Sequence, residues 1–450
     1  MNDNPTASAT RCVSLASAAL LLWTGTAAIA GEPISFRRDV APILQDNCVA
    51  CHGAKKAESG YRLDTFAELL KAGDSGDEPI TAAAGQEGEL LRRLTSGDES
   101  DRMPADSDPL PAEQIALIEK WIAAGAAFDG ENKDQLLSSV IPPADYPDPP
   151  LTYRAAIPIS AVAMSPDGTQ ILAGGYHEIT VWDAAQPRLV RRIKNLGERI
   201  YAIAFHPDGN RLAVACGQPG RSGEVRLVDF ATGQVQAVLA RSADVAWDAA
   251  FRPNSPELAV ASSDNLIRIL NVETLETVRT IASHADWVTA VAWSADGGRL
   301  ASASRDKSAK VFEGDTGRLL SSYQGHGAAV RGIALLPDGK QAVSVGSDGK
   351  IHRWEVEGGK RIAEAAVGGE GYHITWGDGA VLVPCADRKL LKFDLGENKI
   401  TQEFLGAEDW LLSAAWHAPT ARLVGGSLNG QLELWNSSDG SLLHRWVAKP

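Results

Sequence analysis

The run Cys48-Val49-Ala50-Cys51-His52 places two thiols and an imidazole within five consecutive residues. Two cysteines with this spacing can both form thioethers with the vinyl groups of one haem, while the histidine that follows supplies a nitrogen ligand to the iron. The same cysteines could instead form a redox disulfide or half of a zinc site. The motif by itself therefore leaves three chemistries open.

The surrounding sequence favours covalent haem. A zinc site needs further cysteine or histidine ligands, and none occurs between His52 and His177. A thioredoxin-like disulfide lies in an alternating pattern of strands and helices, which this region lacks. We therefore predict one haem c, attached covalently through Cys48 and Cys51, with His52 as the proximal iron ligand.

Met103 is the candidate for the distal iron ligand. Beyond the first thirty residues the only methionines are Met103 and Met164, and Met164 belongs to a repeated hydrophobic pattern described below. Met103 instead lies in a polar stretch, residues 100–107, where simple core packing is a less natural role for a methionine. A thioether opposite an imidazole is a common ligand pair for haem iron.

Two predicted amphipathic helices flank the motif and would position it. The first carries Val40, Ile43 and Leu44 on one face and leads directly into Cys48. The second spans residues 111–124, begins with a proline, ends before a glycine and repeats apolar residues at helical spacing, namely Ile115, Ile118, Trp121 and Ile122. Together these helices predict a small all-α haem-binding domain.

The first thirty residues resemble a secretory signal peptide. Arg11 precedes the apolar run 13–23, and the small-residue site Ala28-Ile29-Ala30 follows. We expect export to the periplasm or an equivalent compartment, with retention of the segment as an uncleaved anchor as the alternative. No later apolar run approaches the roughly 20 residues of a membrane span, so we predict no transmembrane span.

The net charge of the chain limits the choice of binding partners. Residues 31–150 carry 11 basic and 23 acidic side chains, a net charge of −12, whereas residues 151–450 carry a net charge of −2. Such a chain is a poor nucleic-acid binder. The acidic charge of this domain either increases solubility or steers the protein toward a redox partner with a basic docking face.

We interpret the two remaining cysteines, Cys216 and Cys385, as small buried apolar residues.

A proline-rich linker separates the haem region from the rest. Five prolines occur within residues 141–150, and this composition favours a semi-rigid polyproline II spacer. The predicted organisation is a signal peptide at 1–30, a cytochrome c domain at 31–130, the linker at 131–157 and a propeller at 158–450.

Residues 158–450 contain seven repeats. One large apolar position recurs at spacings of 40 to 46 residues, at Met164, Phe205, Phe251, Trp293, Leu335, Trp376 and Trp416. A second series trails it, at Trp182, Val228, Leu270, Phe312, Trp354, Phe393 and Trp435. Turn motifs such as Ser165-Pro166-Asp167-Gly168 follow the first series. This period, with short alternating strands, predicts an all-β propeller of seven blades.

These repeats resemble the WD-repeat family, most plainly at Val181-Trp182-Asp183 and from Gly325-His326 to Trp354-Glu355. The resemblance implies a buried hydrogen-bond network formed by His326, Ser344, Asp348 and Trp354. It also implies a partial network in the preceding repeat, where Phe312 stands in place of the tryptophan, formed by His284, Ser302 and Asp306. Because residues 442–447 already supply a last outer strand, the ring closes either by side-chain packing alone or by pairing of residues 151–154 with the last blade.

The N-terminal region resembles the planctomycete-type cytochrome c domain, which occurs fused to WD repeats. The motifs that carry the resemblance occur in order: residues 36–44, Cys48-Val49-Ala50-Cys51-His52-Gly53, Arg62-Leu63-Asp64, Met103-Pro104 and residues 121–125. The resemblance implies Cys48 and Cys51 as haem anchors, His52 as proximal ligand and Met103 as distal ligand. Ala105 departs from the Met-Pro-Pro run that the family often shows.

These features predict single-electron transfer, because a His/Met-ligated iron has no open position for a substrate. The propeller would then be a docking platform for other proteins. The alternative is a haem-containing subunit or sensor whose propeller binds or transforms a substrate, so enzymatic activity stays open. One repeat contains the residue types of a hydrolytic triad, His326, Ser344 and Asp348. We interpret them as structural, because they lie at the positions of the hydrogen-bond network described above. His177 and His373, each in Gly-Tyr-His, are interpreted as structural histidines.

Overall fold

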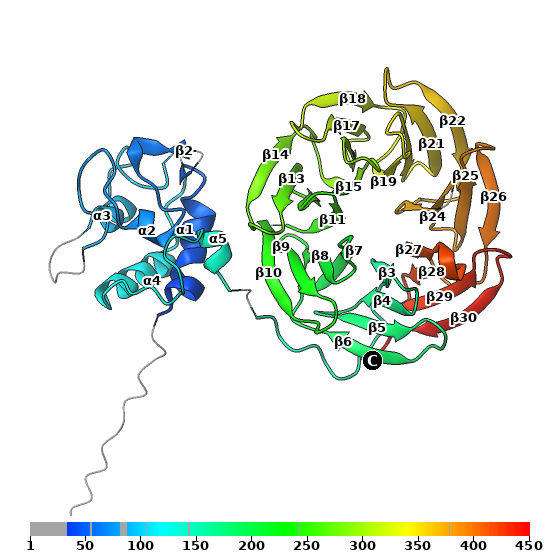
Figure 1. The fold of residues 1–450 in the computed structure, drawn as a ribbon, viewed down its shortest axis with the longest axis horizontal. Coiled ribbons are helices and arrows are strands. Elements are labelled where there is room, and N and C mark those ends of the chain that lie inside the picture. Colours follow the sequence, from blue (N-terminus) through cyan, green and yellow to red (C-terminus); the bar gives the residue numbers. More distant parts are fainter. Residues whose placement is uncertain are drawn as a thin grey trace, which may run out of the picture.

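The computed structural model describes residues 34–54, 56–81, 88–105, 107–142, 145–242, 244–377 and 379–450. The predicted signal peptide, residues 1–30, lies outside the described residues. Within them, a small helical unit precedes a closed ring of strands (Figure 1). No helix in the described ranges is long and apolar enough to cross a membrane.

The helical unit is built from short helices around one hairpin. Its helices are η1 (Phe36–Val40), α1 (Ala41–Asn47), η2 (Glu58–Gly60), α2 (Phe66–Leu69), α3 (Glu89–Thr95), α4 (Ala112–Ala123) and α5 (Leu137–Val140). The antiparallel pair β1 (His52–Gly53) and β2 (Lys56–Ala57) follows the cysteine motif directly. Both predicted amphipathic helices are present, and the hairpin is the one addition to the all-α expectation in the described part of this unit.

Aromatic side chains form the centre of the helical unit. The Phe36 ring lies 4.8 Å from the Phe66 ring and 5.1 Å from the Trp121 ring, measured between centroids. Leu137 is fully buried in the same cluster, and its amide donates to the Asp64 carbonyl over 2.8 Å. The core therefore extends to residue 141, beyond the predicted domain end at residue 130, because apolar residues of α5 close it.

The ring consists of seven antiparallel four-stranded sheets. The first two blades contain β3 (Val162–Met164), β4 (Gln170–Gly174), β5 (Ile179–Asp183), β6 (Leu189–Ile193), β7 (Arg199–Phe205), β8 (Arg211–Gln218), β9 (Ser222–Asp229) and β10 (Val235–Ser242). The next two contain β11 (Ala246–Phe251), β12 (Glu257–Ser262), β13 (Leu266–Asn271), β14 (Thr277–Ala282), β15 (Val288–Trp293), β16 (Arg299–Ser304), β17 (Ala309–Glu313) and β18 (Leu319–Tyr323).

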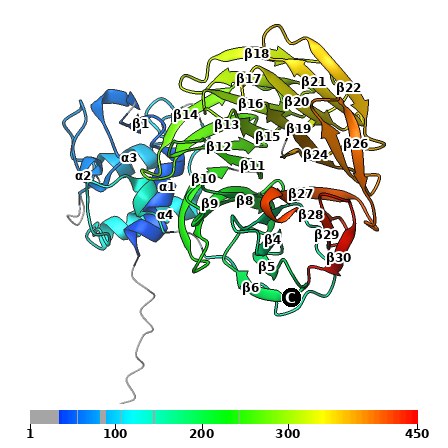
Figure 2. The ribbon, with the colours of Figure 1, turned by 45° about the vertical axis from the view of Figure 1, so that its right-hand side comes forward.

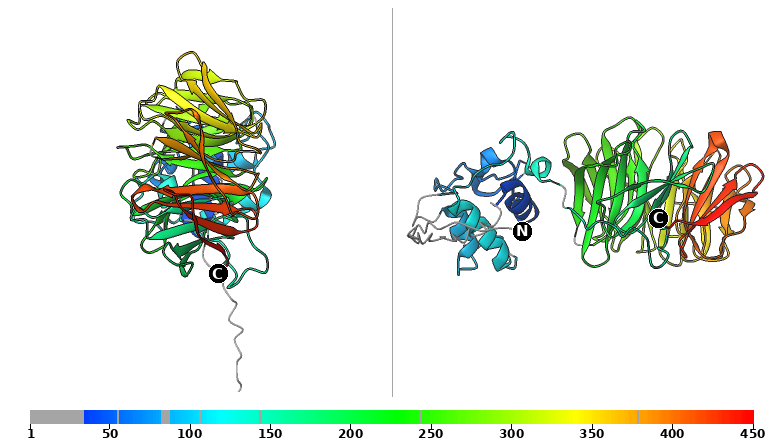
Figure 3. Two further views of the ribbon diagram at one scale, coloured as in Figure 1. Left: turned by 90° about the vertical axis from the view of Figure 1, so that its right-hand side faces the viewer. Right: turned by 90° about the horizontal axis from the view of Figure 1, so that it is seen from below.

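The remaining blades complete the ring, which Figure 3 shows from the side in its right panel. Blades five and six contain β19 (Val330–Leu335), β20 (Gln341–Gly346), β21 (Lys350–Glu355), β22 (Arg361–Ala366), β23 (Thr375–Trp376), β24 (Ala380–Pro384), β25 (Leu390–Asp394) and β26 (Lys399–Phe404). The last blade contains β27 (Leu411–His417), β28 (Arg422–Ser427), β29 (Gln431–Asn436) and β30 (Leu442–Val447). Figure 2 shows the strands of each blade following one another from the centre outward.

The two repeated hydrophobic series explain the blades. Six residues of the first series end the inner strand of their blade, and the seventh, Trp416, lies one position before the end of β27. The second series lies in the third strand of every blade. Within the turns between the first and second strands, Gly168 and Gly339 have φ angles of 67° and 66°, which favour glycine. The seven-bladed prediction is confirmed.

The ring closes by side-chain packing between the first and last blades. The Trp182 and Trp446 rings lie 6.0 Å apart in a cluster that both blades share. The Ile159 amide donates to the Ser427 carbonyl over 3.1 Å, but the described residues 151–154 form no strand with the last blade. The predicted pairing of residues 151–154 is therefore not observed, and the ring closes by side-chain packing together with a backbone hydrogen bond at Ile159.

The second half of the linker lies against the propeller. The Arg226 guanidinium lies 4.5 Å from the centre of the Tyr146 ring, and the Tyr146 amide donates to Asn195 Oδ1 over 2.8 Å. Arg192 donates to the Pro150 carbonyl over 2.7 Å, and the Tyr153 hydroxyl bonds to Glu178. The rigidity expected from proline is thus supplemented by direct attachment to the first two blades.

Candidate functional site

The cysteine motif lies in the turn that ends helix α1. The Cys48 amide donates to the Leu44 carbonyl over 2.9 Å, and the His52 amide donates to the Cys48 carbonyl over 2.9 Å. A Cβ atom at Gly53 would lie 2.6 Å from the Val49 carbonyl oxygen, so glycine permits the tight turn. The local backbone therefore brings both thiols and the imidazole to one end of one helix.

The two thiols are free but differ in environment. Cys48 packs against the aromatic core of the helical unit, and burial together with the nearby Cys51 raises the pKa of its thiol to about 12. Cys51 is exposed to solvent. One of the two predicted haem anchors thus lies at the core and the other at the surface, and neither is engaged in a disulfide.

The His52 imidazole is oriented by the backbone. Its Nδ1 atom lies 3.2 Å from the Tyr61 carbonyl oxygen, and because a carbonyl only accepts, Nδ1 carries the proton. The Tyr61 hydroxyl in turn donates to the Leu69 carbonyl over 3.1 Å, while the Leu63 amide donates to the His52 carbonyl. This tautomer leaves the Nε2 lone pair free for a metal, as in other oriented histidine ligands.

Met103 lies at the margin of the same apolar cluster as Cys48 and Tyr61. Its amide donates to the Arg93 carbonyl over 2.9 Å. The Arg93 side chain is fixed by an ion pair of 2.7 Å with Glu89. The structure therefore places the predicted distal ligand on the cluster that also supports the first haem anchor.

These residues fit a covalently attached haem. Two free thiols and an imidazole with a free Nε2 lie in one turn of chain, and a thioether packs against the same apolar core as Cys48. This is the donor set that a c-type haem requires. Arg102, beside Met103, adds an observation that the sequence did not suggest, because its Nε atom is buried without a hydrogen-bond partner among the described residues. A group that brings carboxylates, as haem does with its propionates, would satisfy that atom.

The predicted network in the fifth blade is present. His326 Nδ1 lies 3.0 Å from the Asp348 carboxylate, and His326 Nε2 lies 2.9 Å from Ser344 Oγ. The Trp354 indole donates to the same hydroxyl over 3.1 Å. Because Ser344 is fully buried, its hydroxyl is closed to any substrate, and the network is structural.

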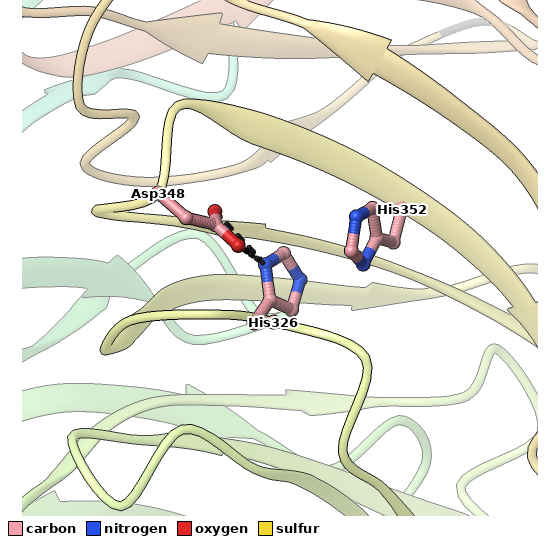
Figure 4. Close-up of side chains that lie close together, drawn as sticks. All are labelled: His326, Asp348 and His352. Atoms are coloured by element: carbon pink, nitrogen blue, oxygen red, sulfur yellow. Dashed lines mark hydrogen bonds and ion pairs between the residues drawn. The ribbon is translucent and has the colours of Figure 1, made fainter.

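A fifth side chain extends this network (Figure 4). The His352 ring stacks on His326 with centroids 4.1 Å apart, and its Nδ1 atom lies 2.9 Å from the Tyr323 hydroxyl. His326, Asp348 and His352 are close enough to suggest a metal site. The lone pairs of stacked rings, however, lie in two nearly parallel planes and do not converge on one metal ion, and both His326 nitrogens already have partners. The cluster is therefore better described as a hydrogen-bonded core.

The comparisons with known families agree with this architecture. Residues 48–107 match the model of the planctomycete cytochrome C family. Residues 150–183, 190–229, 275–313 and 317–355 match the WD domain, G-beta repeat. The chain joins a planctomycete-type cytochrome c domain to a WD-repeat propeller. The resemblances inferred from the motifs are thereby confirmed.

Two curated relatives match the chain over part of its length. The transcriptional corepressor LEUNIG_HOMOLOG of Arabidopsis thaliana is 27% identical over 117 residues, which are 26% of this chain and 14% of that protein. The WD repeat-containing protein WDS homolog of the same plant is 30% identical over 120 residues, which are 26% of this chain and 23% of that protein. The matches thus span less than a quarter of either relative.

In the WD-repeat propeller, the two histidines in Gly-Tyr-His differ in setting. His177 is buried, has a φ of 59° and donates from Nδ1 to the Leu196 carbonyl over 2.9 Å. The Tyr146 ring of the linker lies 5.4 Å from it. His177 is therefore structural, as interpreted, whereas His373 lines the cavity at the centre of the propeller.

The stacked histidine pair predicts acid sensitivity of the WD-repeat propeller. Burial and the neighbouring His326 lower the pKa of His352 from 6.5 to about 4. As the pH falls below 6.5, the unfolded chain takes up this proton first, so the free energy of unfolding decreases until the pH approaches 4. We expect the melting temperature of the propeller to fall over this range, measured by calorimetry.

The His352→Gln variant should lose part of this pH dependence, because it removes one of the titrating groups. His284 and His326, whose pKa values are also lowered by burial, would keep the remainder. The His444→Gln variant, on the outer strand β30, serves as the matched control. Identical pH profiles for wild type and His352→Gln would contradict the assignment.

Proposed function

We propose that this chain is an exported c-type cytochrome that carries one covalent haem and transfers single electrons. The observation that carries the proposal is the oriented His52 imidazole in the same turn as two free thiols, with Nδ1 bonded to the Tyr61 carbonyl and Nε2 free. Cys48 and Cys51 would hold the haem, His52 would be the proximal ligand and Met103 the distal ligand. When bound, the haem supplies reversible one-electron oxidation and reduction.

The chain's own residues would tune and protect this chemistry. The Tyr61 carbonyl holds the His52 ring in one orientation, which increases its basicity as a ligand. Met103 would hold the iron together with His52, so the iron would have no open position for a substrate. Both features support an electron carrier over a catalyst acting at the haem.

The propeller would then serve as a docking platform for other proteins. This part of the proposal draws on the WD-repeat architecture. The net charge of −12 over residues 31–150 supports a redox partner with a basic docking face, because complementary charge accelerates encounter. The association rate should accordingly fall as the ionic strength rises.

The test is covalent haem in the full-length protein. We expect a haem-staining band on a denaturing gel and a reversible one-electron midpoint potential when the protein is exported by a host with cytochrome c maturation machinery. The same host without that machinery should yield no covalent haem. Colourless, folded protein from the maturation-competent host would contradict the proposal.

Export predicts a defined mature N-terminus. The proposal rests on the apolar run before Ala28-Ile29-Ala30, after which cleavage is expected. N-terminal sequencing of the haem-bearing protein should find Gly31 or a residue within one or two positions of it. Met1 or Asn2 at the N-terminus of that protein would show that the segment is retained.

A further inference from the structure

The centre of the propeller contains a cavity of about 420 Å³, large enough for a small organic ligand. Residues of the innermost strands of all seven blades line it. Figure 1, viewed down the ring, shows the innermost strands around its centre. Its wall is mostly aliphatic and includes Ala161, Ala202, Ile203, Val291, Ile333 and Ala414. Polar groups that reach this cavity are therefore unusual and require an explanation.

One position of the inner strands carries two such groups. It lies three residues before the first hydrophobic series and is occupied in five blades by Ala161, Ala202, Ala290, Gly332 and Ser413. The two other blades carry Asp248 and His373, and both side chains line the cavity. Two ionisable groups thus replace small residues in the third and sixth blades, although the other five blades of the ring pack with a small residue at this position.

The Asp248 carboxylate is buried without a cationic partner. It accepts hydrogen bonds from the Ala249 amide over 2.9 Å and from the Val291 amide over 3.0 Å. No lysine or arginine in the described ranges forms an ion pair with it. Burial raises the pKa of this carboxyl, and the His373 imidazole acts in the opposite direction. Each carboxylate oxygen still has an unused lone pair.

His373 provides the second polar group of the cavity. Neither of its ring nitrogens has a hydrogen-bond partner in the part of the chain that the structure describes, although it interacts electrostatically with Asp248. Ser413, by contrast, already donates to the Ile159 carbonyl over 2.8 Å. Within mostly aliphatic walls, the cavity therefore presents a carboxylate that is bonded to two backbone amides but to no lysine or arginine of the described residues. Beside it lies an imidazole without a hydrogen-bond partner among those residues.

We propose that this cavity binds a small primary ammonium compound between the Asp248 carboxylate and the His373 imidazole. An ammonium group offers several N–H donors on one centre, so it can bond to the carboxylate and to a ring nitrogen at once. Its charge offsets the cost of burying the carboxylate. The aliphatic wall suits a short hydrocarbon chain, and the aromatic wall residues Trp293 and Trp376 tolerate a cation. The proposal is independent of the haem.

The probe is n-butylammonium, with n-butanol as its neutral counterpart, titrated into the full-length protein by calorimetry. We expect saturable binding of the ammonium compound and at least tenfold weaker binding of the alcohol. The Asp248→Asn variant should bind the ammonium compound at least tenfold more weakly than wild type. Glu433→Gln is the matched control, because Glu433 is a buried carboxylate of the last blade outside the cavity.

A second variant covers the case in which Asp248→Asn does not fold. His373→Gln leaves both backbone hydrogen bonds of Asp248 in place and should weaken n-butylammonium binding severalfold, while the melting temperature stays near that of wild type. The proposal is overturned by absence of saturable binding to wild type, by equal binding of the alcohol, or by undiminished binding to His373→Gln.

Discussion

Replacing Met103 with alanine should abolish the weak near-infrared charge-transfer band from sulfur to iron in the oxidised protein. The same variant should show a lower reduction potential, by a substantial part of the roughly 0.8 V range that axial ligands span. Its reduced form should bind carbon monoxide, because the iron loses its sixth ligand. Haem should stay covalently attached, since Cys48 and Cys51 are unchanged.

The argument for Met103 combines sequence and packing. In the sequence, no histidine occurs between His52 and His177, which leaves Met103 as the soft neutral ligand within the cytochrome domain. In the structure, Met103 packs on the cluster that also contacts Cys48. Absorption spectroscopy and potentiometry on the purified protein provide the measurement.

The control for this prediction is Met164→Leu. Met164 lies in β3, within the cluster between the first and last blades, so its replacement should leave band, potential and carbon monoxide reactivity unchanged. If Met103→Ala kept both the band and the potential, the ligand would have to come from elsewhere. A propeller histidine folded over the haem would then be the first candidate.

Replacing His326 with alanine should destabilise the propeller by about 1–3 kcal/mol, the cost of leaving buried polar partners unsatisfied. The variant removes the hydrogen-bond partner of Ser344, 2.9 Å from His326, and of Asp348, 3.0 Å from His326. It also removes the ring on which His352 stacks. Chemical denaturation, followed by the fluorescence of the propeller tryptophans, gives the free energy of unfolding.

Haem spectra should be unaffected by His326→Ala, because the network lies within one blade of the propeller. His444→Ala is the control, since this histidine lies on the outermost strand of the last blade. An unchanged denaturation midpoint for His326→Ala would refute the network as a source of stability. No hydrolase activity that depends on Ser344 is expected, because that side chain is fully buried.

Much of this architecture could be predicted from local sequence. The spacing of Cys48, Cys51 and His52 suffices because one turn of chain, stabilised by hydrogen bonds to Leu44 and Cys48, brings the three side chains together. The number of blades could be predicted because each blade is an antiparallel sheet of consecutive strands. Each blade therefore corresponds to one continuous repeat of the hydrophobic pattern in the sequence. Short-range geometry and periodic burial are the physical causes of this success.

Other features depended on contacts that no local pattern specifies. Closure of the ring without a shared strand, burial of residues 137–141 in the cytochrome core, and attachment of Tyr146 to Arg226 each join distant segments. Whether the Arg102 Nε atom is buried without a hydrogen-bond partner likewise depends on the side chains that pack around it. Asp248 and His373 likewise line the same cavity because seven blades close around it. Sequence determined which side chains each blade carries, whereas ring closure decided which of them face one another.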